Sequence, residues 1–185
     1  PIGNFCGPVL RHHSREGFEV YFYSDVRVPE ALTQDLRALE CMWRDTRALS
    51  DEALAALVRD DEIDILVDLT GHTGGDRLLA FARRPAPLQV AWIGYPNTTG
   101  MSAMTHRITD AHADPPGTTE HLHTERLIRM PEIYLPFAVA GAEVPAGAAP
   151  AAPRCAAPRR PAGCSPSGLW PCAVDLGLLR APREV

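Results

Sequence analysis

The sequence of 185 residues contains no lysine, and all 18 of its basic side chains are arginine. Together with abundant alanine, glycine and proline, this bias indicates GC-rich coding DNA and carries no chemical meaning of its own. The formal net charge is −5 and no basic stripe is visible, which argues against a dedicated nucleic-acid binder. No stretch approaches the ~18 consecutive apolar residues of a transmembrane helix, so we expect no membrane partner.

Paired or clustered cysteines are also absent. The five cysteines are odd in number and no two have CxxC spacing, which favours reduced thiols over a disulfide framework or a zinc site. The first residues show neither the basic region nor the apolar region of a signal peptide. We therefore expect a cytoplasmic protein. The motifs of P-loop, α/β-hydrolase and dinucleotide-binding proteins are absent as well.

Composition divides the chain near residue 137. Ala, Pro and Gly make up more than half of residues 141–185, and the scattered prolines leave little room for a helix or a central strand. Two interpretations of residues 138–185 remain open. They form a disordered tail, or, from about Cys155, an out-of-frame translation of GC-rich DNA, because binary patterning is missing. In both cases we expect the function to lie in residues 1–137.

Residues 1–137 alternate between strand and helix patterns. The predicted strands are 18–23, 63–69, 88–93, 107–110 and 126–130, and the predicted helices cover 3–13 and 29–39 and begin at Ser50 and Asp76. Such alternation indicates right-handed βαβ units and a mostly parallel sheet. The predicted fold class is α/β and Rossmann-like.

Ligands of such sheets bind beyond the carboxyl ends of the strands. Two loops follow predicted strands there, at residues 70–76 and 94–100. Both are rich in glycine and hydroxyl groups and poor in charge. Loops of this composition present backbone N–H groups and small side chains, as a sugar or phosphate site requires.

These loops also carry a resemblance. Residues 64–77 (DILVDLTGHTGGDR) and 84–100 (RPAPLQVAWIGYPNTTG) closely resemble the SPINDLY-type O-linked N-acetylglucosamine transferases. Shorter matches continue at 18–21, 109–110, 113–116 and 129–132. The resemblance covers residues 1–137, about three quarters of the chain. The Gly-His-Thr at 71–73 is more similar to bacterial members than to animal ones.

The resemblance implies a two-lobed catalytic region of GT-B type, usually preceded by tetratricopeptide repeats. Such enzymes transfer a sugar with inversion, here N-acetylglucosamine from UDP-GlcNAc, to Ser or Thr hydroxyls of acceptor proteins, with no cofactor and no obligatory metal. This chain is similar to the first lobe only. It starts just after an active-site His that the family carries before the Pro aligned with Pro1. We therefore expect the chain alone to be inactive. An O-fucosyltransferase using GDP-fucose and a non-catalytic truncated remnant are the alternatives.

The resemblance places several residues of the two loops beside the sugar. His72 is the candidate catalytic residue, because an imidazole can bond a sugar hydroxyl or accept a proton. Its alternative role is to cap the following helix or to bond a neighbouring carbonyl. The candidate substrate-binding residues are Thr73, Gly74, Ile93, Gly94, Tyr95, Pro96 and Thr98. Plain turn chemistry is the alternative for Thr73 and Gly74, and a place in the core is the alternative for Tyr95. We favour ligand contact for Gly94 and helix capping for Thr98 and Thr99.

Other residues that match the family pattern have simpler interpretations. Trp92 is expected in the core, Arg77 in a surface ion pair, and Asp68 as a loop-closing acceptor with only a weak case as a base. The pairs His12–His13 and His121–His123 lack metal-ligand spacing, so we expect no metal site. Thr105–His106 departs from the Asp-Tyr of bacterial relatives, which puts the packing before Arg107 in question.

Overall fold

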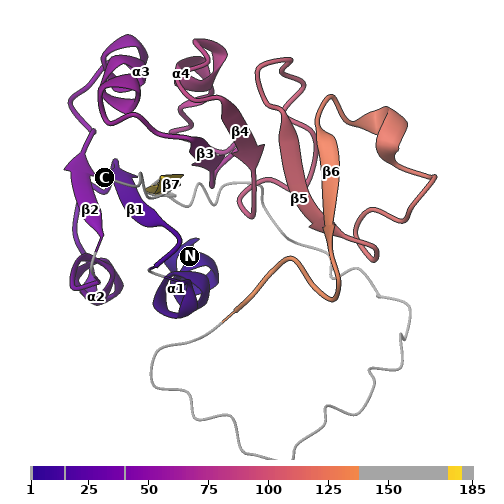
Figure 1. Ribbon diagram of the computed structural model, residues 1–185, viewed down its shortest axis with the longest axis horizontal. Helices are drawn as coiled ribbons and strands as arrows, with labels where there is room; N and C mark the ends of the chain where they lie inside the picture. The colour runs from indigo at the N-terminus through magenta and orange to yellow at the C-terminus, as the bar shows by residue number, and fades with distance from the viewer. Residues whose placement is uncertain (1, 15, 40, 138–174, 181–185) are drawn as a thin grey trace, which may run out of the picture.

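The computed structural model describes residues 2–14, 16–39, 41–137 and 175–180 (Figure 1). The helices are α1 (Ile2–His12), α2 (Ala31–Arg37), α3 (Asp51–Asp60), α4 (Leu78–Ala82) and the short 3-10 helix η1 (Glu120–Leu122). The strands are β1 (Glu19–Ser24), β2 (Met42–Asp45), β3 (Ile65–Asp68), β4 (Leu88–Ala91), β5 (His106–Asp110), β6 (Arg126–Met130) and β7 (Asp175–Arg180). No described helix is long and apolar enough to cross a membrane.

The strands form one sheet in the order β2-β1-β7-β3-β4-β5-β6. All pairings are parallel except those of β7, which runs antiparallel to both β1 and β3. The predicted mostly parallel α/β fold is confirmed. In the β3–β4 pair Asp68 lies opposite Ala91, so both strands end at the same edge of the sheet.

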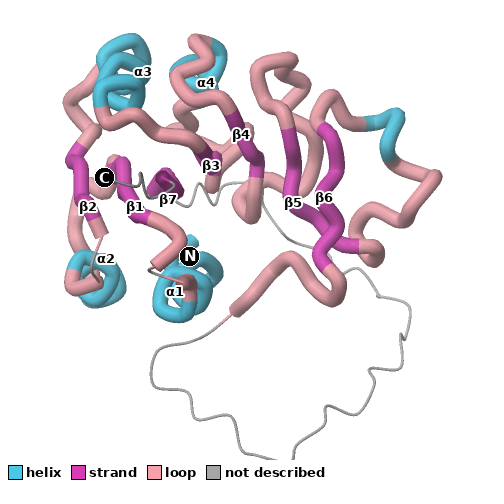
Figure 2. The backbone as a smooth tube through the Cα atoms, in the orientation of Figure 1, coloured by secondary structure: helices cyan, strands magenta, loops and turns pink. Residues whose placement is uncertain are grey.

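The sheet is covered on both faces, with α3 and α4 on one side and α1 and α2 on the other (Figures 1 and 2). Alternation along β1 shows how. Tyr21 and Tyr23 join the core beneath α3 and α4, whereas Val20 and Phe22 join the core beneath α1 and α2. Successive side chains of a strand point to opposite faces, so an apolar and aromatic run suits a doubly covered strand.

Local sequence signals account for most boundaries. The Ser50 hydroxyl accepts a hydrogen bond from the Ala53 N–H at 3.2 Å, which confirms the predicted N-cap of α3. Strand β2 was not predicted. It has only four residues, lies at the sheet edge and is partly exposed, so it carries no clear apolar alternation.

The predicted disordered or out-of-frame tail covers residues 138–185. Residues 138–174 and 181–185 lie outside the described residues. Within the described part, Asp175–Arg180 differs from that prediction, because its backbone forms β7 between β1 and β3. Backbone pairing on both sides satisfies the strand's N–H and C=O groups whatever its sequence pattern.

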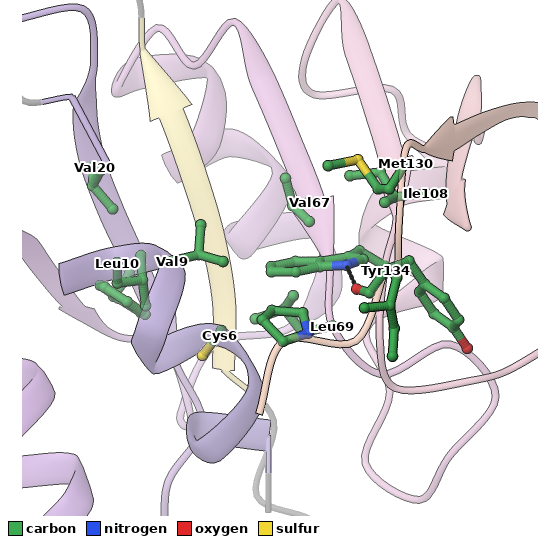
Figure 3. A pocket seen from close by; sticks show the side chains of 13 residues that line it. Cys6, Val9, Leu10, Val20, Val67, Leu69, Ile108, Met130 and Tyr134 are labelled. Carbon is green, nitrogen blue, oxygen red and sulfur yellow. Dashed lines mark hydrogen bonds between the residues drawn. The ribbon is translucent and has the colours of Figure 1, made fainter. Parts of the chain in front are cut away.

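An apolar groove of about 370 Å³ lies between α1 and the sheet face that carries Val67, Trp92 and Ile108 (Figure 3). At its rim Met130 and Ile133 are 42% and 63% exposed. The lining is suited to apolar groups rather than to a sugar, because a sugar needs polar partners on several sides.

Candidate functional site

The two loops predicted to face a ligand lie together at the carboxyl edge of the sheet. The first loop, residues 70–76, follows β3, and the second loop, residues 94–100, begins three residues after the end of β4. Because β3 and β4 are neighbouring parallel strands, their loops leave the sheet side by side. This is the position where α/β sheets bind ligands.

Asp68, the last residue of β3, ties down the start of the first loop. It is 1% exposed and accepts hydrogen bonds from the Thr70 N–H at 3.0 Å, the Thr70 hydroxyl at 2.8 Å and the Gly71 N–H at 2.8 Å. Burial raises the pKa of Asp68, and these hydrogen bonds act in the opposite direction. The predicted role as a loop-closing acceptor is confirmed.

Two glycines interlock the loops. Gly71 has φ +56°, and a Cβ there would lie 2.3 Å from the Tyr95 Cβ. A Cβ on Gly94 would lie 2.0 Å from the backbone oxygen of Leu69. Each loop therefore approaches the other where any larger residue would collide. Contact between the loops is a sufficient reason for Gly94 to be glycine, so its predicted contact with a ligand stays a prediction.

His72 bridges the loops. Its Nε2 lies 2.8 Å from the backbone oxygen of Thr99, and its ring meets Tyr95 edge-on with the centroids 5.3 Å apart. A carbonyl oxygen only accepts hydrogen bonds, so Nε2 carries the proton and Nδ1 keeps a lone pair in the neutral ring. The side chain is otherwise exposed. Of the two structural alternatives, capping of α4 finds no support, whereas the bond to a neighbouring carbonyl is present, formed with the backbone oxygen of Thr99.

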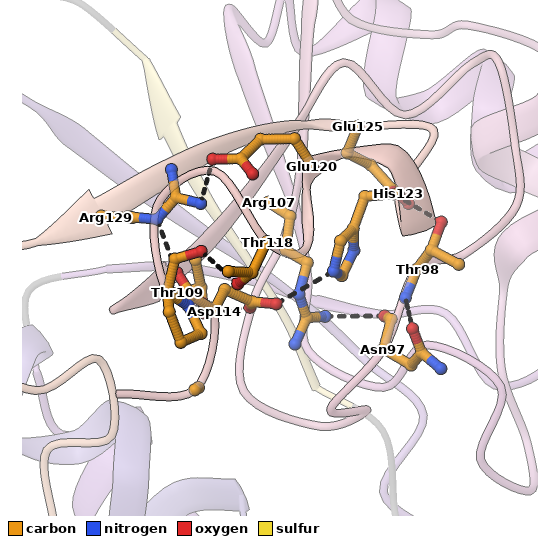
Figure 4. A network of polar contacts seen from close by, with 12 residues as sticks. Asn97, Thr98, Arg107, Thr109, Asp114, Thr118, Glu120, His123, Glu125 and Arg129 are labelled. Carbon is orange, nitrogen blue, oxygen red and sulfur yellow. Dashed lines mark hydrogen bonds and ion pairs between the residues drawn. The ribbon is translucent and has the colours of Figure 1, made fainter. Parts of the chain in front are cut away.

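The second loop is held by two buried side chains, one in the adjacent strand β5 and one just before β6 (Figure 4). Arg107 of β5 is 2% exposed and donates from one nitrogen to the backbone oxygens of Tyr95 at 2.8 Å and Asn97 at 2.7 Å. Glu125, just before β6, is 4% exposed and accepts from the N–H and hydroxyl of Thr99 and from the Thr98 hydroxyl. Charge-assisted bonds of this kind are stronger than neutral ones.

The pKa of Glu125 reflects this arrangement. Burial acts to raise it, but the hydrogen bonds from Thr99 and Thr98 outweigh burial, and the pKa is lowered overall. Glu125 therefore stays a carboxylate at neutral pH and keeps its acceptors available to the loop.

Backbone amides distinguish the two loops. In the second loop the Thr98 N–H donates to the Asn97 side chain, the Thr99 N–H to Glu125 and the Gly100 N–H to the Thr98 hydroxyl. In the first loop, the four consecutive amides of residues 72–75 donate to no atom of the described residues. A row of unused N–H groups can bind an oxygen-rich ligand. A Cβ on Gly74, within this row, would meet no other atom within 4 Å.

Of four other predicted site residues, Thr73, Ile93 and Thr98 are held within the protein, and Pro96 is exposed. The Thr73 hydroxyl donates to the Thr70 backbone oxygen at 3.0 Å. Ile93 is 8% exposed and has φ +68°, a strained conformation for a β-branched residue. The Thr98 hydroxyl bonds Glu125 at 2.7 Å, and the predicted helix capping by the threonines is wrong, because no helix follows them before β5.

The residues expected to be structural are so. Arg77 pairs with Asp25 at 2.6 Å and Asp51 at 3.0 Å, which confirms the predicted ion pair. Trp92 packs on the core beneath α1 and donates from Nε1 to the Tyr134 backbone oxygen at 3.0 Å.

Two further points concern residues flanking the site. The Thr105 hydroxyl donates to the Gln89 backbone oxygen at 2.7 Å, and this bond settles the packing before Arg107. His123 is paired with Asp114 at 3.0 Å, and the described residues hold no group of three potential metal ligands.

Sequence reasoning missed Glu125 and, as a loop anchor, Arg107. The available signal was a charged residue inside or beside a strand pattern, since a buried charge needs specific partners. The partners of Arg107 and Glu125 depend on how β5 and β6 pair beside β4, and no local sequence pattern predicts that pairing.

Together, the mostly parallel sheet, the helices on its two faces and the loops at its carboxyl edge define a Rossmann-like α/β domain with a pair of loops suited to a ligand. The family described as glycosyl transferase family 41 matches residues 6–138. The chain belongs to this family.

Individual relatives agree. The chain is 43% identical over 154 residues to a probable UDP-N-acetylglucosamine–peptide N-acetylglucosaminyltransferase SPINDLY of Oryza sativa subsp. japonica, covering 80% of this chain and 16% of that protein. A protein of the same name from Arabidopsis thaliana is 41% identical, with 80% and 17% covered. The chain thus spans about a sixth of these relatives.

A solved structure is similar as well. A K341M mutant of the Thermobaculum terrenum O-GlcNAc transferase superposes with a TM-score of 0.71 at 53% identity. The match covers 74% of this chain and 26% of that one.

Proposed function

We propose that this chain forms the sugar-facing side of the first lobe of a cytoplasmic protein O-glycosyltransferase, whose donor is UDP-GlcNAc and whose acceptors are Ser or Thr hydroxyls. The observation that carries the proposal is the first loop. It offers four unused backbone N–H groups at residues 72–75 beside the ring of His72, at the carboxyl edge of a parallel sheet. Membership of the family and the names of the relatives supply the class of reaction.

The reaction is a displacement at the anomeric carbon. The acceptor oxygen forms a bond to that carbon, the bond from the carbon to the diphosphate oxygen breaks, and the hydroxyl proton leaves to a base. Nδ1 of His72 has the lone pair to take that proton or to hold a sugar hydroxyl. The unused amides orient the sugar's oxygens, and positioning of the two reactants lowers the barrier.

The nucleotide diphosphate requires partners that this site does not offer. Arg77 is occupied by Asp25 and Asp51, and Arg107 is buried beneath the second loop. We propose that another part of the longer protein stabilises the leaving group, and that the 185-residue chain alone transfers no sugar.

The test is a titration of the ¹⁵N-labelled 185-residue chain with UDP-GlcNAc, GDP-fucose or UDP at millimolar concentration, followed by amide chemical shifts. We expect UDP-GlcNAc to shift the amides of residues 72–75 more than UDP does, and His72→Ala to weaken that response. Glu132→Gln, at an exposed position remote from both loops in sequence, is the matched control. Shifts confined to other residues, or equal shifts with UDP alone, would contradict the proposal. A larger response to GDP-fucose would indicate that GDP-fucose is the donor instead of UDP-GlcNAc.

A further inference from the structure

A chain of hydrogen bonds runs from Glu125 through Thr99 to His72, and the inference drawn from it rests on the function proposed for His72. The Glu125 carboxylate binds the N–H of Thr99 at 2.7 Å and also the Thr99 hydroxyl. Its second oxygen binds the Thr98 hydroxyl at 2.7 Å. Three donors on one buried carboxylate fix the orientation of the peptide around Thr99.

The opposite end of the same residue faces His72. The backbone oxygen of Thr99 lies 2.8 Å from Nε2, and Thr99 is 4% exposed, so water does not compete freely for that oxygen. Because the carbonyl can only accept, the contact selects the ring form with the proton on Nε2. An unrestrained neutral imidazole exchanges between both forms.

Arg107 supports the same loop from a separate direction. It binds the backbone oxygens of Tyr95 and Asn97, which precede Thr98 in the chain. Its Nε is buried with no hydrogen-bond partner, and among the described residues it forms no ion pair. A buried cation with incomplete partners costs stability. Arg107 thus holds the second loop while one of its own nitrogens lacks a partner.

We propose that Glu125 is a positioning residue for His72. By fixing the Thr99 peptide, it holds the proton of the neutral ring on Nε2 and leaves Nδ1 as the atom available to the substrate hydroxyl. Glu125 does not touch the substrate. It acts on His72 through one backbone carbonyl.

The test measures the ring form directly. Long-range ¹H–¹⁵N spectra of the full 185-residue chain distinguish protonated from bare ring nitrogens, above the pH at which histidine titrates. We expect the Nε2–H form of His72 to dominate in the wild type. In Glu125→Gln the ratio of the Nε2–H to the Nδ1–H form should fall about fivefold, the ratio that one ordinary hydrogen bond supports. Glu132→Gln should leave it unchanged.

Thr98→Val provides a second variant: it removes one donor from Glu125 and keeps the charge, and it also removes the acceptor of the Gly100 and Thr124 amides. Backbone amide spectra establish whether each variant keeps the sheet. A dominant Nδ1–H form in the wild type overturns the proposal, and so does an unchanged ratio in a folded Glu125→Gln. If Glu125→Gln does not fold, an unchanged ratio in Thr98→Val overturns it.

This readout is independent of sugar binding. The ring form changes in Glu125→Gln if the positioning role is correct, even where the donor titration fails. Conversely, donor shifts at residues 72–75 without any change in ring form would support the proposed function and reject the role of Glu125.

Discussion

The two loops at the carboxyl edge have similar compositions but differ in how many of their backbone groups are hydrogen-bonded within the protein. In the second loop the amides of residues 98–100 and the backbone oxygens of Tyr95 and Asn97 are hydrogen-bonded within the protein, and the amides of Tyr95 and Asn97 have no acceptor among the described residues. The first loop is tied at its base by Asp68 and leaves four amides unused. One loop is therefore a fixed support, and the other keeps its hydrogen-bonding capacity for a ligand.

The difference shows why a glycine-rich loop is not by itself a ligand loop. Gly71 and Gly94 are glycines because the loops touch each other. Gly74 has no such neighbour, and no positive φ requires glycine there. Gly100 in the second loop also has open space around a Cβ, but its φ of +70° favours glycine by itself, so of these two glycines Gly74 alone has neither a steric nor a backbone reason within the protein. The predictions that follow use this contrast, from the largest expected effect to the smallest.

Gly94→Ala should be the most damaging change. Its Cβ would lie 2.0 Å from the Leu69 backbone oxygen, and neither backbone can yield without separating the two loops. We expect a loss of about 3 kcal/mol in the free energy of unfolding, in the upper range for overpacking. Urea unfolding followed by circular dichroism measures it. A loss below about 1 kcal/mol would show that the loops are not interlocked as described.

Glu125→Gln should have the next largest effect, because three donors lose a charged acceptor. We expect a loss of about 2 kcal/mol at neutral pH. The folded pKa of Glu125 is lowered, so its contribution is complete above the unfolded pKa and disappears as pH falls through the folded pKa.

The pH dependence supplies the control for that variant. Urea midpoints of wild type and Glu125→Gln should therefore converge in acid, while other carboxylates titrate in both proteins. A difference that is constant from pH 7 to 3 would exclude a charged Glu125 as the acceptor.

His72→Ala should cost less stability, about 1 kcal/mol, since it removes one hydrogen bond and one ring contact from an exposed side chain. The effect should concentrate in the loops. Amide hydrogen exchange should speed up around residues 99–100 and leave the strands unchanged. Exchange that accelerates evenly through the sheet would indicate that His72 stabilises the whole fold instead.

Gly74→Ala should be nearly neutral for stability, within about 0.5 kcal/mol, because its Cβ meets no atom within 4 Å. It should nonetheless reduce the shifts that UDP-GlcNAc produces at residues 72–75, by placing a methyl group among the free amides. An Ala variant that responds to the donor like the wild type would remove Gly74 from the site.

The fold was predictable because its signals are local. The aromatic and apolar run at 18–23 and the Ser50 cap are properties of neighbouring residues, and the corresponding strand and helix form within one or two positions. Strand β2 lacked such a signal, and β7 lies in a segment whose composition predicted no strand. Strand β2 forms as the edge strand beside β1, and β7 forms by pairing with β1 and β3 on its two sides.

For the site, the sequence alone determined where the loops lie and that Asp68, His72 and the glycines belong to them, because strand ends and turn residues are written locally. Tertiary structure alone decided which loop has its backbone groups hydrogen-bonded to the rest of the protein. The acceptors of the second loop are contributed by Arg107 and Glu125, which stand beside it only because β4, β5 and β6 pair in parallel. Hydrogen-bond partners so distant in sequence are chosen by sheet packing, and no local pattern encodes them.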